Sequence, residues 1–388
     1  MVVSRPACCV CVLAMTVILA LGPVARADEL PPATQKMLAE LKLDPALLKG
    51  IDAELKVPDA WVEGARNEGA VIIYDTIRPR EWHKVQSVFA ARYPFVKLDH
   101  QEVHTATRRY IMPMTALKQG RITVDLIQPL SGMPTQFRSR EFFEDLSALP
   151  NYQHMPAYLL TKDDITVVTR LSYWCMSYNT KLVKQEDLPK TWDDLLDSKV
   201  FADKKLMIAN RPNNWVLGLW ETHGDAWGEA YFAKFFEKLQ PQIRKESLNA
   251  LVKLTGIGEG HGAIPQAMNR VGEVSATGAP VAYHCPEPVT FLPTEGGILR
   301  NSPRVNGAKI FLNWFISREG QIAQFWVDRS TPVRAELHGR EFLGYPDAVL
   351  GKKMVKAGSE ETKVKVQKYW NSLWLRGGGT IDAGAEAE

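Results

Sequence analysis

The sequence predicts an α/β fold with two lobes, each a mostly parallel sheet with flanking helices. Its 388 residues fit two domains at roughly 150 residues per domain. A hydrophobic content of 45% supplies the core that a disordered chain lacks. From Gly69 onward, short apolar runs alternate with amphipathic segments in a βαβ pattern, and a weaker α/β pattern follows over 173–280.

Residues 1–27 read as a signal peptide that directs the protein to the periplasm. Arg5 supplies the positive charge, residues 7–21 form an apolar run, and Ala25-Arg26-Ala27 matches the small-x-small pattern of a signal-peptidase site. The apolar run is shorter than the roughly 20 residues that span a bilayer. After cleavage, 45 basic residues face 44 acidic ones, a net charge of +1, and two of the five cysteines remain. Such a balance excludes a typical nucleic-acid binder.

The elements expected in the first lobe follow a helical stretch and alternate between strand and helix. Proline marks three helix boundaries or interruptions, since it starts a helix well and breaks its interior. The expected elements are short helices over 28–65, a strand over 70–74, a helix from Pro79 to Pro94, a strand over 95–103, a helix over 104–120 interrupted at Pro113, and a strand over 124–127.

The second stretch alternates in the same way, although its pattern is weaker. We expect a strand over 205–209, a helix over 227–239, a short helix around 264–270, a strand over 280–283 and a helix over 305–317. The last dozen residues, rich in Gly, Ala and Glu, are expected to fray.

Three segments have a characteristic order and spacing: WCMSYNT at 174–180, LPKTWDDLL at 188–196 and AKIFLNWFISREGQ at 308–321. Together with Glu68-Gly69 before the first strand, they resemble the extracellular solute-binding proteins of ABC importers. The closest branch is the ferric-iron-type group of class II periplasmic binding proteins. The similarity extends from about Ala65 to Arg334.

This resemblance implies a type II periplasmic-binding-protein fold, in which two crossover strands join the lobes and a ligand lies in the cleft between them. It also implies that the second lobe is inserted into the first. The expected division is a signal peptide (1–27), a helical N-terminal extension (28–65), the first part of lobe 1 (66–172), lobe 2 (173–280), the second part of lobe 1 (281–337), and a C-terminal helical segment with a flexible tail (338–388).

Candidate ligand contacts in the first lobe follow the strands, because open α/β sheets bind ligands beyond the carboxyl ends of their strands. A guanidinium there can grip a carboxylate or phosphate, and free N–H groups at a helix start attract anions. The candidates are Thr76, Arg78, His104, Thr105, Arg108 and Gln128. The alternatives are an exposed surface arginine and an ordinary capped helix start.

Candidates in the second lobe follow the strand over 205–209, lie in a glycine-rich loop over 256–262, or lie near the two crossings. Amide, guanidinium and phenol groups there can hydrogen-bond a ligand. The candidates are Arg211, Asn213, Asn214, His261, Tyr173 and Tyr283. A polar turn and core packing of the tyrosines are the alternatives.

Metal and enzyme chemistry have weaker support. His100, Glu102 and His104 would share one strand face, but such a face is more often core. Ferric members of the resembled family hold iron through paired tyrosines, and this sequence has no Tyr-Tyr pair. Nucleophile, HExxH and phosphate-loop motifs are missing, so we expect no enzyme, cofactor or metal site. Cys175 and Cys285 either pair with each other or line the cleft as free thiols.

The favoured interpretation is a monomeric periplasmic component of an ABC transporter that captures a small ligand, preferably an anion, and delivers it to the permease at the inner membrane. The alternatives are a ligand-sensing subunit for a membrane receptor and a binding protein for ferric iron or a ferric chelate. A secreted hydrolase is disfavoured by the missing motifs.

Overall fold

The computed structural model describes residue 1 and residues 30–381, except 106, 131–132, 357 and 359. The strands of this part are β1 Val71–Asp75, β2 Leu98–Glu102, β3 Leu126–Ile127, β4 Val167–Asn179, β5 Leu206–Ala209, β6 Gln242–Arg244, β7 Gly262–Ala267, β8 Val281–His284, β9 Val289–Ile298 and β10 Met354–Lys356. The predicted α/β class is confirmed. The expected signal peptide lies outside the described residues, apart from Met1.

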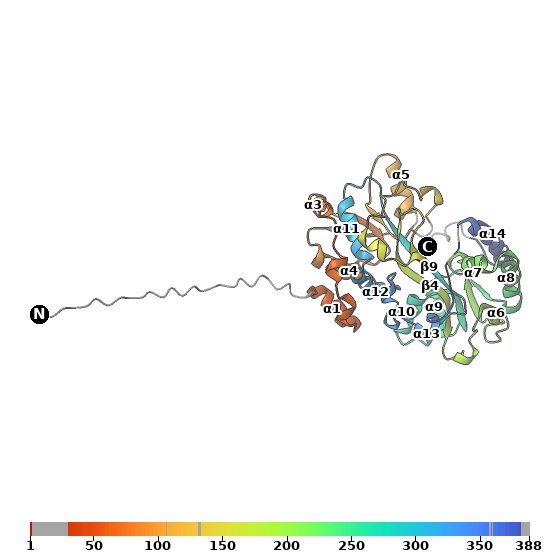
Figure 1. Cartoon of the computed structure of the whole chain (residues 1–388). Helices are drawn as coiled ribbons and strands as arrows, with labels where there is room; N and C mark the ends of the chain where they lie inside the picture. The colour runs from red at the N-terminus through yellow and green to blue at the C-terminus, as the bar shows by residue number, and fades with distance from the viewer. Residues whose placement is uncertain (2–29, 106, 131–132, 357, 359, 382–388) are drawn as a thin grey trace.

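The sheet has two halves that share two long strands. Its order is β2-β1-β3-β9-β4-β7-β5-β6, with β10 beside β9 and β8 beside β4. Strands β1, β2 and β3 run parallel in one half, and β5, β6 and β7 run parallel in the other. Strands β4 and β9 run antiparallel to each other and to β7 and β3. Figure 1 shows the halves as two lobes joined through β4 and β9.

The helices of the first lobe pack around an aromatic core. Phe89 lies edge-on to Phe311 and Trp314, at ring-centroid distances of 5.3 and 5.2 Å. These rings join α4 and α11, which are more than 200 residues apart in the chain. The core of the first lobe is therefore complete only when both of these chain segments are in place. The helices are α1 Pro32–Leu41, α2 Ile51–Glu54, α3 Asp59–Asn67, α4 Pro79–Arg92, α5 Met112–Lys118, α11 Val305–Phe315 and α12 Arg318–Asp328.

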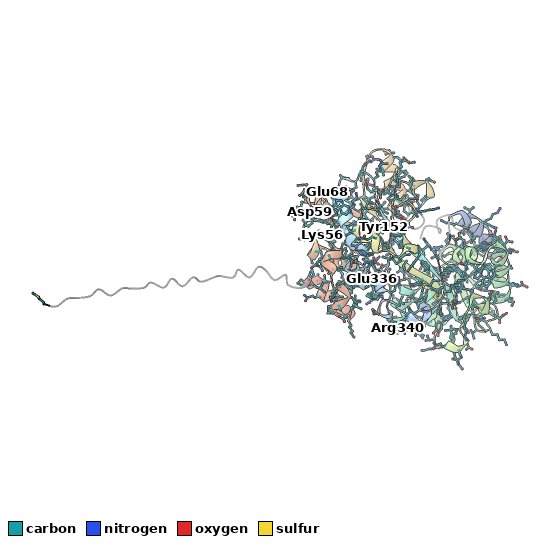
Figure 2. The ribbon with its side chains drawn as sticks, viewed as in Figure 1. Lys56, Asp59, Glu68, Tyr152, Glu336 and Arg340 are labelled. Atoms are coloured by element: carbon teal, nitrogen blue, oxygen red, sulfur yellow. A yellow bond between two sulfur atoms is a disulfide. The ribbon has the colours of Figure 1, made fainter. Side chains whose placement is uncertain are left out.

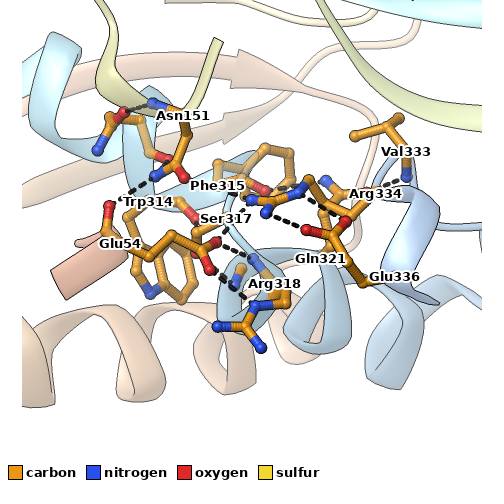
Figure 3. A network of polar contacts seen from close by, with 12 residues as sticks. Glu54, Asn151, Trp314, Phe315, Ser317, Arg318, Gln321, Val333, Arg334 and Glu336 are labelled. Carbon is orange, nitrogen blue, oxygen red and sulfur yellow. Dashed lines mark hydrogen bonds and ion pairs between the residues drawn. The ribbon is translucent and has the colours of Figure 1, made fainter. Parts of the chain in front are cut away.

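The N-terminal extension belongs to this lobe. Glu54 of α2 accepts hydrogen bonds from Arg318 at 2.7 Å and from Arg334 at 2.6 Å (Figure 3). Arg334 is only 1% exposed, and its buried charge is paired with Glu54 and with Glu336. Thr34 of α1 donates a hydrogen bond to the buried Glu319 of α12 at 2.7 Å. These polar contacts tie the extension to α12 and to the segment that follows it.

Glu68, part of the segment that resembles the binding-protein family, has a structural task. Its carboxylate accepts backbone hydrogen bonds from Asn306 at 3.2 Å and Gly307 at 2.8 Å. These two N–H groups lie in the first turn of α11, which has no capping side chain of its own. The carboxylate of Glu68, at the end of α3, therefore caps the start of α11. Figure 2 labels Glu68.

The second lobe has its own aromatic core. The ring of Trp215 lies 5.5 Å from Phe232 of α8 and 5.8 Å from Trp370 of α14. The remaining helices are α6 Trp192–Leu195, α7 Val216–His223, α8 Asp225–Leu239, α9 Leu248–Ile257, α10 Met268–Ser275, α13 Pro346–Val349 and α14 Glu360–Arg376. Within the described part of the chain, none of the helices has the length and apolar character needed to cross a membrane.

One expected helix is wrong. Residues 262–267, expected to enter a helix around 264–270, form the fully buried strand β7, and the helix α10 begins only at Met268. Strand β7 pairs with both β4 and β5, so ladder hydrogen bonds on two sides outweigh local preference. Pro265 is tolerated because the pairing with β4 is irregular here, between Gln266 and Ala263.

The crossovers are the two long strands. Residues 167–173 of β4 pair with β9, and residues 174–179 pair with β7 or β8. The expected boundary at 172/173 falls inside β4, and the one at 280/281 falls just before β8, which pairs with the second-lobe part of β4. Beside this junction, Cys175 and Cys285 form a disulfide with a Cα–Cα distance of 5.0 Å, so they are not free thiols.

Candidate functional site

The carboxyl edges of both half-sheets lead to the crossover. In the first lobe, the last residue of β3 pairs with Gly297 of β9. Six residues earlier on β9, Phe291 pairs with Tyr173 of β4. In the second lobe, Ala267 at the carboxyl end of β7 pairs with Trp174. Because residues 173 and 174 are neighbours on β4, the two carboxyl edges face each other across β4 and β9. Open α/β sheets bind ligands at such edges.

The first-lobe edge is organised by Asp75 at the end of β1. This carboxylate is 1% exposed and accepts backbone hydrogen bonds from Thr76 and Ile77. Its second oxygen accepts a hydrogen bond from the amide nitrogen of Gln128. The carbonyl oxygen Oε1 of Gln128 is buried and has no partner among the described residues. Gln128 therefore offers the oxygen Oε1 as an acceptor, and the hydrogen bond from its Nε2 atom to Asp75 fixes the side chain.

A second polar group joins the same edge to the crossover. Arg170 of β4 forms an ion pair with Asp328 at 3.0 Å and donates a weaker hydrogen bond to the Thr76 hydroxyl at 3.4 Å. Burial raises the pKa of Asp328, although Arg170 opposes that shift. Asn269 of α10, in the second lobe, donates to the backbone oxygen of Asp328 at 3.2 Å. This group therefore connects the two lobes.

Sequence reasoning missed the three charged residues of this edge. Asp75 adjoins Thr76 at a strand end, so its position was readable from the pattern. Arg170 lies inside a strand and Asp328 at the end of a helix, 158 positions away in the chain. No local pattern links these two, and only the fold brings them together.

The arginines near η2, the π-helical turn Thr107–Ile111, point in different directions. Arg109 is 4% exposed and donates to the backbone oxygens of Val103 at 3.2 Å and His104 at 3.1 Å. Burial lowers its pKa. Arg108 is exposed and lines a cavity of about 490 Å³ beside α5, together with Tyr74. Arg108 is therefore not brought to the Asp75–Gln128 cluster.

The other first-lobe candidates are open to solvent. Arg78 is exposed at the start of α4, and Thr105 is exposed before η2. The His104 side chain is 60% exposed and contacts the Glu102 carboxylate at 2.8 Å. Of the six predicted contacts in this lobe, Thr76 and Gln128 share one polar cluster.

The second-lobe edge gathers the predicted residues that follow β5. The guanidinium of Arg211 donates to the backbone oxygen of Asn210 at 3.0 Å. The buried Oδ1 atom of Asn213 has no partner among the described residues. Arg211, Asn213 and Asn214 lie on or beside η7, the 3₁₀ turn Pro212–Asn214, which contacts the crossover strand β9. Cationic and acceptor groups are thus placed together here.

His261 is separated from these residues. It precedes Gly262, which pairs with Leu206, the first residue of β5, whereas Arg211 follows the last one. Its ring nitrogen Nδ1 contacts the backbone oxygen of Val200 at 2.7 Å. The expected grouping of His261 with the other contacts is therefore not what the structure shows, because the glycine-rich loop enters β7 at its amino end.

Both predicted tyrosines lie in the core at the crossover. Tyr173 is 7% exposed and Tyr283 is 4% exposed. Burial raises the pKa of Tyr173 to about 12 and that of Tyr283 well above its usual value. The Tyr283 ring packs against Tyr345 at a centroid distance of 5.7 Å. Their positions match the core-packing alternative that the sequence left open.

The strand face considered for a metal has a different arrangement. The His100 ring stacks on Trp82 at a centroid distance of 4.1 Å, and burial lowers its pKa. The described residues contain no group of three or more His, Cys, Asp and Glu side chains that could hold a metal ion. We assign His100 to packing.

Comparison with known proteins identifies the family. Residues 114–340 match the family model described as bacterial extracellular solute-binding protein. The chain belongs to this family. Among curated proteins, a Haemophilus influenzae protein described as uncharacterized is 23% identical over 138 residues, which are 35% of this chain. The alignment spans 40% of the length of that curated relative.

Solved structures share the fold of this solute-binding protein. A Bradyrhizobium japonicum ABC transporter substrate-binding protein is 16% identical with a TM-score of 0.62, covering 79% of this chain and 99% of that one. Trichodesmium IdiA (FutA), in complex with iron and citrate, is 16% identical with a TM-score of 0.64 and the same coverage. Actinobacillus pleuropneumoniae AfuA, with fructose-6-phosphate bound, is 16% identical with a TM-score of 0.56, covering 78% and 98%. At these identities the likeness concerns the fold.

Proposed function

We propose that this protein is the periplasmic component of an ABC importer, which captures a small solute between its lobes and delivers it to the permease at the inner membrane. The observation that carries the proposal is the meeting of two polar carboxyl edges at the crossover of β4 and β9. Family membership and the signal-like N-terminus support export. In this role the protein acts as a monomer and catalyses no reaction.

The side chains at the two edges favour a hydroxylated organic anion as the ligand. Arg211 supplies a cation at the second-lobe edge. Gln128 and Asn213 each leave a buried oxygen acceptor without a partner among the described residues, and such acceptors call for ligand donors. A hydroxy acid or a sugar phosphate has both an anionic group and hydroxyl donors. We assign the anion contact to Arg211 in preference to the exposed Arg78 and Arg108.

Capture follows from hinge motion about the crossover strands. Two lobes joined by few strands close around a ligand when the chain bends at those strands. Arg170, Asp328 and Asn269 connect the lobes beside that hinge. A ligand that contacts both Gln128 and Arg211 therefore stabilises the closed form by differential binding.

A thermal-shift panel on the purified mature chain tests the proposal. The panel contains citrate, fructose 6-phosphate, inorganic phosphate, glucose, putrescine and ferric ion supplied with nitrilotriacetate. We expect a hydroxylated anion to raise the melting temperature, because a ligand at a concentration of 100 times its dissociation constant adds roughly 2.7 kcal/mol to the free energy of unfolding. A large shift with ferric ion and none with the organic anions would reject the anion proposal and favour the iron alternative.

Arg211→Ala is the first variant to test. We expect the shift given by the anion to fall by at least half, because a guanidinium–anion contact contributes about 1.5–3 kcal/mol. Arg376→Ala, at the exposed end of α14, is the matched control and leaves the shift unchanged. Equal losses in both variants would contradict the assignment of Arg211.

Delivery is tested in cells. Deletion of the gene removes ligand-dependent uptake if the protein serves an importer. Lost signalling with intact uptake would favour the receptor-linked alternative and overturn the transport proposal.

A further inference from the structure

The C-terminal helix α14 lies outside the family-matched residues 114–340, yet it is built into the second lobe. Figure 1 shows it beside α7 and α8. Lys365 forms an ion pair with Asp225, and the Tyr369 hydroxyl donates to the backbone oxygen of Glu229 at 2.7 Å. Asp225 and Glu229 both belong to α8, so these contacts hold α14 against α8 in the second lobe.

One residue of α14 contacts both ends of the loop that follows β5. The Trp370 indole donates from Nε1 to Oδ1 of Asn210 at 2.9 Å. Its ring lies edge-on to Trp215 at a centroid distance of 5.8 Å. Trp370 is 1% exposed, so both contacts are shielded from water. The residues between these two anchors include Arg211 and Asn213, the candidate ligand contacts.

The backbone of this loop has little regular support of its own. Its two ends are non-helical, with φ −138° and ψ 58° at Arg211 and φ −143° and ψ −44° at Trp215. Inside the loop, the Asn214 amide donates to the Arg211 oxygen at 3.3 Å and the Trp215 amide to the Pro212 oxygen at 3.2 Å. These two bonds are at the long end of the range, whereas the Arg211 backbone N–H donates to the Ala209 oxygen at 2.8 Å at the start of the loop. The side-chain anchors therefore matter most for residues 212–215.

Asn210 also orients the cation. Its side chain accepts the Trp370 hydrogen bond, while its backbone oxygen accepts the hydrogen bond from the Arg211 guanidinium at 3.0 Å. Movement of Asn210 therefore moves Arg211 as well.

We propose that α14 is a structural arm of the second-lobe ligand site and that Trp370 is the residue that positions the Asn210–Asn214 loop. Its consequence for ligand capture rests on the proposed function, but the positioning itself is measurable without a ligand. Trp370 contacts the loop and not the solute, so its effect on affinity acts through Arg211 and Asn213.

Hydrogen–deuterium exchange of the ligand-free mature chain tests the positioning. Trp370→Phe keeps a ring but removes the donor, and we expect exchange over 211–215 to rise about fivefold, as for the loss of one net hydrogen bond. Trp374→Phe is the matched control, because Trp374 is on the same helix, is 1% exposed and donates to the Thr380 oxygen at 3.1 Å. Trp374 also stacks on Trp370 at a centroid distance of 6.5 Å, and phenylalanine keeps a ring at this position. That variant should therefore raise exchange near residue 380 and leave the loop unchanged.

Equal exchange over 211–215 in Trp370→Phe and the parent chain would overturn the proposal, as would an equal rise in both tryptophan variants. A double-mutant cycle with Asn210→Ala adds a second criterion. If the two residues act through one hydrogen bond, the double variant exchanges no faster than Asn210→Ala alone. A fully additive rise would assign the effect to general loosening and reject the specific role of Trp370.

The two proposals fail separately. Raised loop exchange in Trp370→Phe without any shift in the ligand panel would retain the positioning and reject the anion proposal. An anion shift that depends on Arg211, with loop exchange unaffected in Trp370→Phe, would retain the ligand proposal and reject the positioning.

Discussion

At the residue scale, burial shifts the pKa values of several side chains near the crossover. His284 ends β8, and its Nε2 atom donates to the backbone oxygen of Pro189 at 2.7 Å. Burial lowers the pKa of His284 to about 4, and the nearby Lys352 acts in the same direction. The imidazole is therefore neutral in the folded protein at neutral pH.

This shift predicts a loss of stability in mild acid. The folded pKa of about 4 lies below the unfolded value of 6.5, so the unfolded state binds more protons between those pH values. The free energy of unfolding should fall by about 3 kcal/mol as pH drops from 6.5 to 4, from this residue alone. Urea titrations over that pH range measure the change.

The His284→Gln variant removes the titrating group and should flatten the slope between pH 4 and 6.5. His104→Gln, at a side chain that is 60% exposed, is the control for the removal of a histidine as such. Identical slopes in the parent chain and His284→Gln would show that other groups cause any acid sensitivity.

At the element scale, the junction of α11 and α12 depends on a glycine in the segment that resembles the family. A Cβ atom at Gly320 would lie 2.1 Å from the Trp314 oxygen and 2.6 Å from the Phe315 Cα atom. Both are backbone atoms and have no rotamer by which to move away. The two helices therefore meet at a distance that only glycine permits.

Two glycine-to-alanine substitutions should have opposite signs. Gly320→Ala is expected to lower the free energy of unfolding by about 3 kcal/mol, in the range of severe overpacking. Gly272→Ala, inside α10 and with no atom within 4 Å of the added Cβ, should raise it by about 0.5–1 kcal/mol because alanine favours the helix. Chemical denaturation of both variants measures the difference. Destabilisation of similar size in both would contradict the steric account.

At the scale of the whole molecule, strands β4 and β9 connect the two lobes, and the contacts of Asp328 with Arg170 and Asn269 add to this connection. One disulfide lies beside the same junction. Cys175 lies on the crossover strand β4, and Cys285 follows β8, 110 positions later. Both side chains are 0% exposed. The bond therefore closes the whole second-lobe insertion into a loop and lies in the core beside the hinge.

Removing this disulfide should destabilise the protein strongly. The Cys175→Ala, Cys285→Ala double variant is expected to lose about 2–4 kcal/mol of unfolding free energy, since the unfolded chain regains the freedom of a long loop. Denaturation under oxidising conditions measures the loss. As a control, the parent chain is reduced in denaturant and its unfolding is measured in the same titration. If the parent chain is equally stable with and without the disulfide, the expectation is contradicted.

Much of the fold was predictable because its signals are local. Prolines and apolar periodicity located α4, the restart at Pro113 and the strand ends at Thr76, Gln128 and Arg211. The strand β7 was not predicted, because its pairing on both sides depends on β4 and β5. The position of His261 followed from that error, since a helix start and a strand start present the preceding loop at different edges.

The sequence by itself determined the fold class, the order of the first-lobe strands and helices up to β3, and the family, because periodicity, capping and motif spacing act within short stretches of chain. Only the tertiary structure decided which side chains meet. Asp328 reaches Arg170, and Trp370 reaches Asn210, across 158 and 160 positions. Contacts of that separation are set by how helices and strands pack, and no local pattern in the chain encodes them. The candidate site therefore combines strand ends that were readable with supporting residues that were not.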